Sequence, residues 1–446
     1  MPKGANGGNG GAVNRWADNH RRVWRLAGPV ILSNITTPLL GAVDTGVVGR
    51  LPDAALIGGV ALGSLIFNFV FWGFGFLRMG TTGLTAQALG ADDRIELRAI
   101  FLRSLALAAG IGVMLVVLQS PIHFLALRFV NSSAAVRDYA GQYFDVRIWS
   151  APAAFANYTI LGWLLGTGRT GMALFLQVAL NGINILLAIF FVLVLGWGIP
   201  GVAGATLTSE VLTACGGLVL VFRLLPGVKV PKLFDRHRML QVLHVNANIM
   251  IRTLCLEAAF VAFTFAAASE GDILFAANAI LMNLLTMSAY GLDGFAMAAE
   301  ILVGRAVGAR DRTGFRAAIR DSTIWAGGLA ILGTAVFFIA GPLLISLFTV
   351  HQDVQALAVR YLPWLAVSPL LGVWCFQLDG IYVGATRTTE MRNGMIIALA
   401  GYLLALWLAL PRWGNDGLWL TLMVFYVLRM GTLGIWLPRI DRSLAA

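Results

Sequence analysis

The chain has 446 residues, of which 58% are hydrophobic and 12% charged, with a formal net charge of +10. Soluble domains carry about twice that share of charged residues, so this composition excludes a soluble protein. Long apolar runs such as 105–118 and 183–195 lie in segments that can cross a membrane as helices. The alternation typical of membrane β-barrels is missing, so the sequence predicts an all-α polytopic membrane protein.

Splitting the apolar runs at Pro, Gly and charge clusters predicts twelve transmembrane helices. Their ranges, in chain order, are 26–49, 54–83, 97–119, 137–165, 171–196, 200–223, 240–268, 273–303, 316–340, 355–383, 391–410 and 415–437. With both termini in the cytoplasm, only Arg50, Arg128, Arg137 and Arg412 of the 32 Lys and Arg residues fall in outer loops. This asymmetry follows the positive-inside rule, which explains the basic net charge better than nucleic-acid binding does.

The second half of the chain repeats the first at a constant offset of 218 residues. Asp93, Arg94, Gly162, Gly166 and Arg169 reappear as Asp311, Arg312, Gly380, Gly384 and Arg387. Six helices separate the copies, so both halves have the same orientation and form two six-helix lobes. The predicted divisions are a cytoplasmic tail 1–25, an N-lobe 26–224, a cytoplasmic linker 225–239, a C-lobe 240–438 and a cytoplasmic tail 439–446.

Two packed lobes with a seam between them suit a protein that opens alternately to the two faces of a membrane. Transport is therefore the favoured class. Lys3, Lys229 and Lys232 are the only lysines, and none follows the Gly-rich loop of a P-loop ATPase. We predict no cofactor and a H⁺ or Na⁺ gradient as the energy source.

Acidic residues within the predicted helices are functional candidates, because an ionised carboxylate in hydrocarbon is costly. They are Asp44, Glu210, Glu257, Asp293, Glu300 and Asp379. Asp44 has no acidic counterpart in the second lobe, where Ala262 stands at the equivalent position, so lobe symmetry does not account for it. We predict that Asp44 is the proton-coupling group; the alternative is a carboxylate that reaches water or Arg50.

The other acids each allow two interpretations. Asp293 and Glu300 share a helix face and could form a cation site or pair with an intramembrane arginine. Glu257 is either an ion ligand or a partner of Arg252, and Asp379 is either a substrate ligand or an anchor between helices. For Glu210 we favour a structural role.

Uncharged polar residues in the first lobe are further candidates for the substrate pocket. They are Asn157, Asn181, Asn184 and Thr206, although such amides more often bond one helix to another. Pro29 removes a backbone hydrogen bond from the first helix and is a candidate hinge, or an ordinary helix-start proline.

One motif points to a different class of protein. Asp92, Asp93 and Glu96 resemble the acid pairs that hold Mg²⁺ in membrane prenyltransferases. The repeat argues against this enzyme, because Arg310 replaces the first acid in the second copy. The five histidines lack ligand spacing, so we predict no metal site and no enzyme.

Along nearly its whole length, the sequence resembles the multidrug and toxic compound extrusion (MATE) transporters, in the branch named for DNA-damage-inducible protein F. The matching strings are Asp44-Thr45-Gly46-Val47-Val48-Gly49, Leu77-Arg78-Met79-Gly80-Thr81-Thr82-Gly83-Leu84-Thr85-Ala86-Gln87, Leu292-Asp293-Gly294-Phe295 and Gly384-Ala385-Thr386-Arg387-Thr388-Thr389-Glu390-Met391-Arg392-Asn393. The resemblance implies an exporter in the bacterial inner membrane that exchanges organic cations or amphiphiles for H⁺ or Na⁺. We predict that it is a monomer.

The resemblance also implies roles for single residues. Asp44 matches the family's coupling acid, and Pro29 the position where the first helix bends on protonation. Asn157, Asn184 and Thr206 match polar positions of the first-lobe pocket. The branch often has an Asp where this chain has Ala188, which favours H⁺ over Na⁺ in that lobe.

Two alternatives remain, one for the coupling ion and one for the transported substrate. Glu257 resembles the helix-7 acid of the NorM-like branch, which keeps a Na⁺ site in the second lobe as an alternative. The rival function within the superfamily is a flippase for lipid intermediates.

Overall fold

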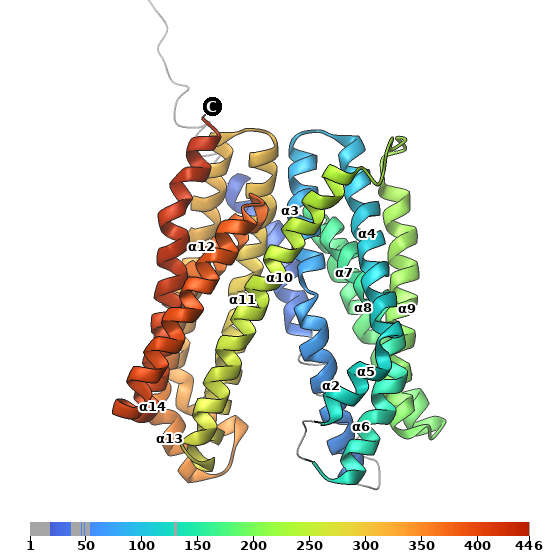
Figure 1. Ribbon diagram of the computed structural model, residues 1–446. Coiled ribbons are helices and arrows are strands. Elements are labelled where there is room, and N and C mark those ends of the chain that lie inside the picture. Colours follow the sequence, from blue (N-terminus) through green and yellow to red (C-terminus); the bar gives the residue numbers. More distant parts are fainter. Residues whose placement is uncertain (1–17, 37–45, 47–48, 50–53, 129–131, 446) are drawn as a thin grey trace, which may run out of the picture. The chain divides into compact units, whose positions relative to one another are not determined.

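The computed structural model describes residues 18–36, 46, 49, 54–128 and 132–445, and the regular structure in them is helical (Figure 1). Two compact units are formed. The N-unit comprises the described residues of Leu32–Met250, and the C-unit comprises residues 18–31 together with those from Ile251 onward. The first helix, over residues 18–36, crosses the boundary between these units.

The N-unit is built from helices that pack in pairs, among them α3 with α7, α4 with α7 and α8 with α9. In chain order its elements are α2 (Ala54–Gly73), α3 (Phe76–Gly90), α4 (Arg94–Val117), α5 (Gln119–Arg128), α6 (Ala134–Arg147), η1 (Ile148–Ser150), α7 (Ala151–Gly166), α8 (Thr170–Ile189), η2 (Phe190–Val194) and α9 (Gly198–Leu224). The predicted helix 137–165 is thus divided by the 3₁₀ turn η1 just before Pro152, which occupies the first turn of α7.

The C-unit consists mainly of long helices. They are α10 (Arg236–Ser269), which begins in the N-unit, α11 (Asp272–Gly308), α12 (Arg312–Phe348), α13 (Gln352–Gly384) and α14 (Thr388–Ser443). Helices α11, α12 and α13 pack against one another. Gly414 interrupts α14 with a left-handed φ of 51°, which separates the two predicted helices 391–410 and 415–437.

Nine helices in the described part of the chain are long and apolar enough to cross a membrane. This number agrees with the twelve predicted helices, because α14 contains two of them, η1 divides a third, and 26–49 lies partly outside the described residues. The chain is an all-α polytopic membrane protein with two repeated halves, as the sequence predicts.

The repeat is visible in the turns that follow α3 and α11. Asp92 and Arg310 both adopt a φ of 53°. The next residue of each copy, Asp93 or Asp311, accepts a hydrogen bond from a backbone amide three residues later, at 2.9 Å. Each carboxylate therefore caps the following helix, which accounts for its conservation between the two halves without a metal.

Two duplicated glycines allow close packing of helix backbones. A Cβ at Gly162 of α7 would lie 2.6 Å from the carbonyl oxygen of Arg78 in α3. At the equivalent position in the C-unit, a Cβ at Gly380 of α13 would collide with the carbonyl of Ala296 in α11. The repeat therefore preserves one helix-crossing contact in both halves.

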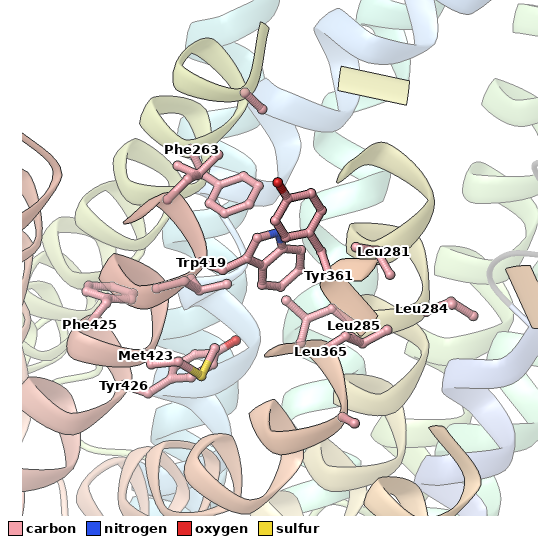
Figure 2. Packing of buried hydrophobic residues seen from close by; sticks show 14 of the residues in the cluster. Phe263, Leu281, Leu284, Leu285, Tyr361, Leu365, Trp419, Met423, Phe425 and Tyr426 are labelled. Atoms are coloured by element: carbon pink, nitrogen blue, oxygen red, sulfur yellow. The ribbon is translucent and has the colours of Figure 1, made fainter. Parts of the chain in front are cut away.

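The interior of the C-unit is filled by large apolar side chains (Figure 2). Trp419 of α14 packs edge-on against Phe263 of α10, with ring centroids 5.4 Å apart. Both rings are fully buried. This packing joins α10 to the second segment of α14.

Gly162→Ala should destabilise the protein, because the added methyl group must displace the α3 backbone; overpacking of this kind costs about 1–3 kcal/mol. Gly182→Ala in α8 is the control, since a Cβ there meets no atom of the described residues within 4 Å and alanine favours helix. Thermal unfolding of the purified variants in detergent measures both effects. Equal melting temperatures for the two variants would contradict the packing argument.

Candidate transport site

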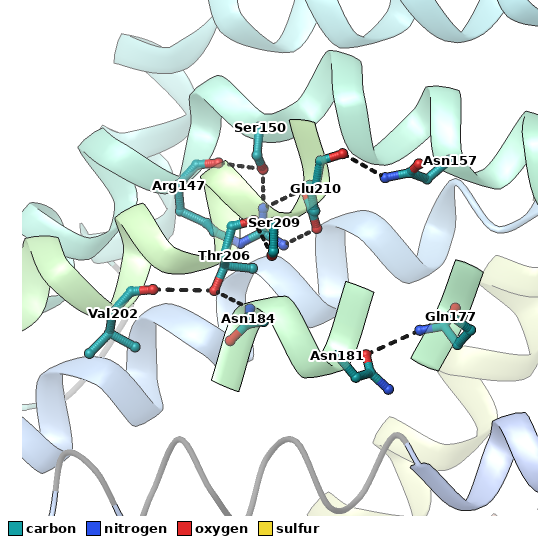
Figure 3. Close-up of polar contacts among 10 residues, drawn as sticks. All are labelled: Arg147, Ser150, Asn157, Gln177, Asn181, Asn184, Val202, Thr206, Ser209 and Glu210. Carbon is teal, nitrogen blue, oxygen red and sulfur yellow. Dashed lines mark hydrogen bonds and ion pairs between the residues drawn. The ribbon is translucent and has the colours of Figure 1, made fainter. Parts of the chain in front are cut away.

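The N-unit contains a buried ion pair between α6 and α9 (Figure 3). The Nη1 and Nη2 atoms of Arg147 donate to the two carboxylate oxygens of Glu210 at 2.9 and 2.7 Å. Both residues are 8% exposed. The guanidinium carbon of Arg147 also lies 5.1 Å from the ring centroid of Phe71. This bidentate pair neutralises both charges and favours the structural interpretation of Glu210.

Polar side chains from α7, α8 and α9 surround this pair. Asn157 donates to the backbone carbonyl of Glu210 at 3.0 Å, and Asn184 donates to the hydroxyl of Thr206 at 3.0 Å (Figure 3). Thr206 in turn donates to the carbonyl of Val202. The carbonyl oxygen of the Asn184 side chain is buried and has no partner among the described residues. An acceptor is thus available to a substrate or an ion within this polar cluster.

The first helix contacts this cluster through its last described turn. Asn181 of α8 donates to the hydroxyl of Thr36 at 3.0 Å and accepts from Gln177 at 3.2 Å. Pro29 lies in the same helix, which continues through it to residue 36. Asp44, eight positions after Thr36 in the sequence, lies outside the described residues.

The C-unit contains a second buried ion cluster, centred on Asp379 of α13. Arg252 of α10 and Arg429 of α14 both donate through Nη2 to the same oxygen, Oδ2, of Asp379; the Arg429 distance is 2.7 Å. The three residues are between 4% and 8% exposed. Asp379 therefore joins three helices, an arrangement that favours the anchor interpretation over direct binding of a cation.

The remaining candidate acids of the C-unit are Glu257, Asp293 and Glu300. Glu257 of α10 is buried, and its Oε1 has no partner among the described residues. Glu300 is buried in α11, where Asp293 is half-buried. In the described part of the chain, Arg252 and Arg429 form their ion pairs with Asp379 and not with any of these three acids. Glu257 stays a candidate ion ligand. For Asp293 and Glu300, both interpretations stay open: a cation site or a pair with an intramembrane arginine.

Sequence reasoning missed a buried amide pair in the C-unit. Asn278 of α11 donates to Asn415 of α14 at 2.6 Å and accepts from the indole of Trp419 at 2.9 Å. The signal that could have revealed it was an amide inside each of two apolar segments. Arginines inside apolar segments, such as Arg147, were likewise a signal for ion pairs that the sequence could not assign to partners.

No group of three or more His, Cys, Asp or Glu side chains is arranged to hold a metal ion in the residues that the structure describes. Asp93, the central residue of the prenyltransferase-like motif, instead caps α4. Helices that span a membrane, polar clusters inside each repeated half and this duplicated architecture define a membrane transporter.

The family profile described as MatE matches residues 29–190 and 249–410, once in each repeated half, and the chain belongs to this family of multidrug transporters. Members of the family are transporters and not enzymes. The chain is 44% identical to DNA damage-inducible protein F of Escherichia coli (strain K12) over 425 residues, which cover 93% of this chain and 92% of the relative.

More distant similarities agree with this assignment. The chain is 26% identical to the probable multidrug resistance protein NorM of Agrobacterium fabrum, covering 93% of this chain and 90% of that protein. A MOP superfamily transporter structure from Pyrococcus furiosus aligns with a TM-score of 0.86 at 19% identity, covering 96% of this chain and 97% of that one. This structural similarity supports the fold alone.

Arg147→Gln should destabilise the protein by about 3–5 kcal/mol, because it leaves the Glu210 carboxylate buried without its partner. Replacing both residues by leucine should cost less than the sum of the two single leucine replacements. Arg137→Gln is the matched control, since Arg137 is exposed on the same helix and donates to the backbone carbonyl of Ser132. Thermal unfolding measures the coupling; additive losses would contradict a paired interaction.

Proposed function

We propose that this protein is a proton-coupled antiporter that exports organic cations or amphiphiles, with Asp44 as the group that exchanges proton for substrate. The observation that carries the proposal is the bidentate pairing of Glu210 with Arg147. The acids inside the predicted N-lobe helices are Asp44, Asp138, Asp145 and Glu210. Asp138 and Asp145 are exposed on α6, which leaves Asp44 and Glu210 as the candidates. Since Glu210 is committed to an arginine, Asp44 is the remaining acid available for coupling in that lobe.

The polar surroundings support a binding role for the same lobe. Asn184 and Thr206 bond to each other on neighbouring helices, and the Asn184 carbonyl oxygen has an unused acceptor. Asn181 links α8 to Thr36, in the helix segment that precedes Asp44 in the sequence. Ala188 is fully buried in α8 where the branch often carries an acid, so the motif supplies one carboxylate fewer to a Na⁺ ion.

The mechanism follows from competition between a proton and a cation for one carboxylate. Ionised Asp44 attracts a cationic or polarised substrate, and protonation removes that attraction. Protons entering from outside therefore release substrate there, and loss of the proton to the cytoplasm restores binding. Pro29 is proposed as the point where the first helix bends between these states, because it lacks a backbone donor. We place the protein in a bacterial inner membrane, across which the required proton gradient exists. Both termini would lie in the cytoplasm.

Asp44→Asn should lower pH-driven dye transport in proteoliposomes by about tenfold or more, because an amide cannot exchange a proton at physiological pH. Asp44→Glu should retain part of the transport. Asp138→Asn, which changes an exposed acid of α6, is the matched control and should transport normally.

The same vesicles test the ion and the site together. A pH gradient should drive transport without Na⁺, whereas a Na⁺ gradient alone should not. Normal pH-driven transport by correctly inserted Asp44→Asn would refute the coupling assignment. Transport that requires Na⁺ and is lost in Glu257→Gln would move the coupling site to the C-lobe.

A further inference from the structure

The Asp379 cluster carries more positive than negative charge. Arg252 and Arg429 both approach one oxygen of a single carboxylate, so two guanidinium groups face one acid. Neither guanidinium makes an ion pair with a second carboxylate in the part of the chain that the structure describes. In the N-unit, by contrast, Arg147 and Glu210 balance one to one. The C-unit cluster therefore holds one uncompensated positive charge.

The hydrogen-bonding capacity of the cluster is also unfilled. Among the described residues, the buried Nε atoms of Arg252 and Arg429 and the buried Oδ1 atom of Asp379 have no partner, although the Nη2 atom of each arginine donates to Oδ2 of Asp379. Guanidinium Nε and Nη2 hydrogens point in parallel from one edge, and this fork matches two oxygens of one carboxylate or sulfonate. A structural ion pair alone would not require these two free donors.

The surroundings of the cluster keep bulk water away from its excess positive charge. Arg429 is 4% exposed, and its guanidinium carbon lies 5.5 Å from the ring centroid of fully buried Phe425. An uncompensated cation in such a place is costly and requires a counter-ion.

We infer that Arg252 and Arg429 form a buried anion-binding site in the C-lobe that accepts one monovalent oxyanion, a carboxylate or a sulfonate. Asp379 holds the two guanidinium groups together and sets the net charge of the site to one. The site is separate from the cation chemistry proposed for Asp44. It extends the range of substrates to zwitterions and amphipathic acids, whose negative group would bind at this cluster.

The test measures binding of small anions to the purified full-length protein. Acetate, methanesulfonate and chloride are titrated at constant ionic strength in a fluoride background, which contains no oxyanion, and the unfolding temperature is followed by tryptophan fluorescence, since an anion that binds the folded state raises it. Acetate and methanesulfonate should give saturable shifts, and chloride should bind about tenfold more weakly because it cannot accept from both fork positions. Saturation by chloride alone would overturn the oxyanion assignment.

Variants of the cluster should change the apparent dissociation constant in opposite directions. Arg252→Gln should weaken acetate binding by about tenfold or more, and Asp379→Asn should strengthen it, because the latter removes the competing negative charge. Arg252→Lys replaces Arg252→Gln in the test if the latter does not fold. It keeps the charge but loses the fork, and should bind acetate more weakly than the native protein. Arg360→Gln, an exposed arginine of α13, is the matched control and should be unchanged.

Three outcomes would refute the inference: no saturable shift with any oxyanion, equal shifts in native protein and the folded Arg252 variants, or weaker binding by Asp379→Asn. These measurements do not involve proton transport, so their failure leaves the proposal for Asp44 standing, and the reverse also holds.

Discussion

Charged side chains inside apolar helices must find partners on other helices, because hydrocarbon cannot solvate them. The ion pair between Arg147 and Glu210 meets this constraint in the N-unit, and the cluster around Asp379 meets it in the C-unit. Each joins helices that are distant in sequence. The same constraint distinguishes structural from functional acids: a carboxylate committed to an arginine is a poor carrier of a proton.

The duplication of the chain explains why the helices that carry these charges have the same turns, caps and close contacts in both halves. The turn at Asp92 and Arg310, the helix caps at Asp93 and Asp311, and the close contacts of the paired glycines occur in both halves. The buried charges do not follow this symmetry. The N-unit pair joins α6 to α9, whereas the C-unit cluster joins α10, α13 and α14. A common scaffold therefore supports two different ion clusters, a one-to-one pair in the N-unit and two arginines with one carboxylate in the C-unit.

Most of the fold could be predicted from the sequence, since long apolar segments, the distribution of arginines and the constant repeat offset are local or linear signals. The helix boundaries were less accessible. The break in 137–165 depends on a single turn at η1, and α12 continues to Phe348, beyond the predicted end at 340. Both deviations lie within apolar or weakly polar segments, where hydropathy does not mark the end of a helix.

The site was predictable in its residue types but not in its pairings. Asn184 and Thr206 were candidates for a common pocket, and the structure shows them bonded. The partner of Glu210 lies 63 residues away, and the partners of Asp379 lie 127 and 50 residues away, so helical spacing could not identify them. Only the three-dimensional arrangement of the helices decides which arginine meets which acid.

Proton flux driven by the substrate tests the account most directly. Proteoliposomes with equal pH and no Na⁺ on both sides would receive an outward gradient of an organic cation, and a trapped pH dye would record the interior. The account predicts that protons enter as the cation leaves, and that Asp44→Asn abolishes this movement. Equal proton entry with Asp44→Asn, or cation export by native protein without proton movement, would contradict it.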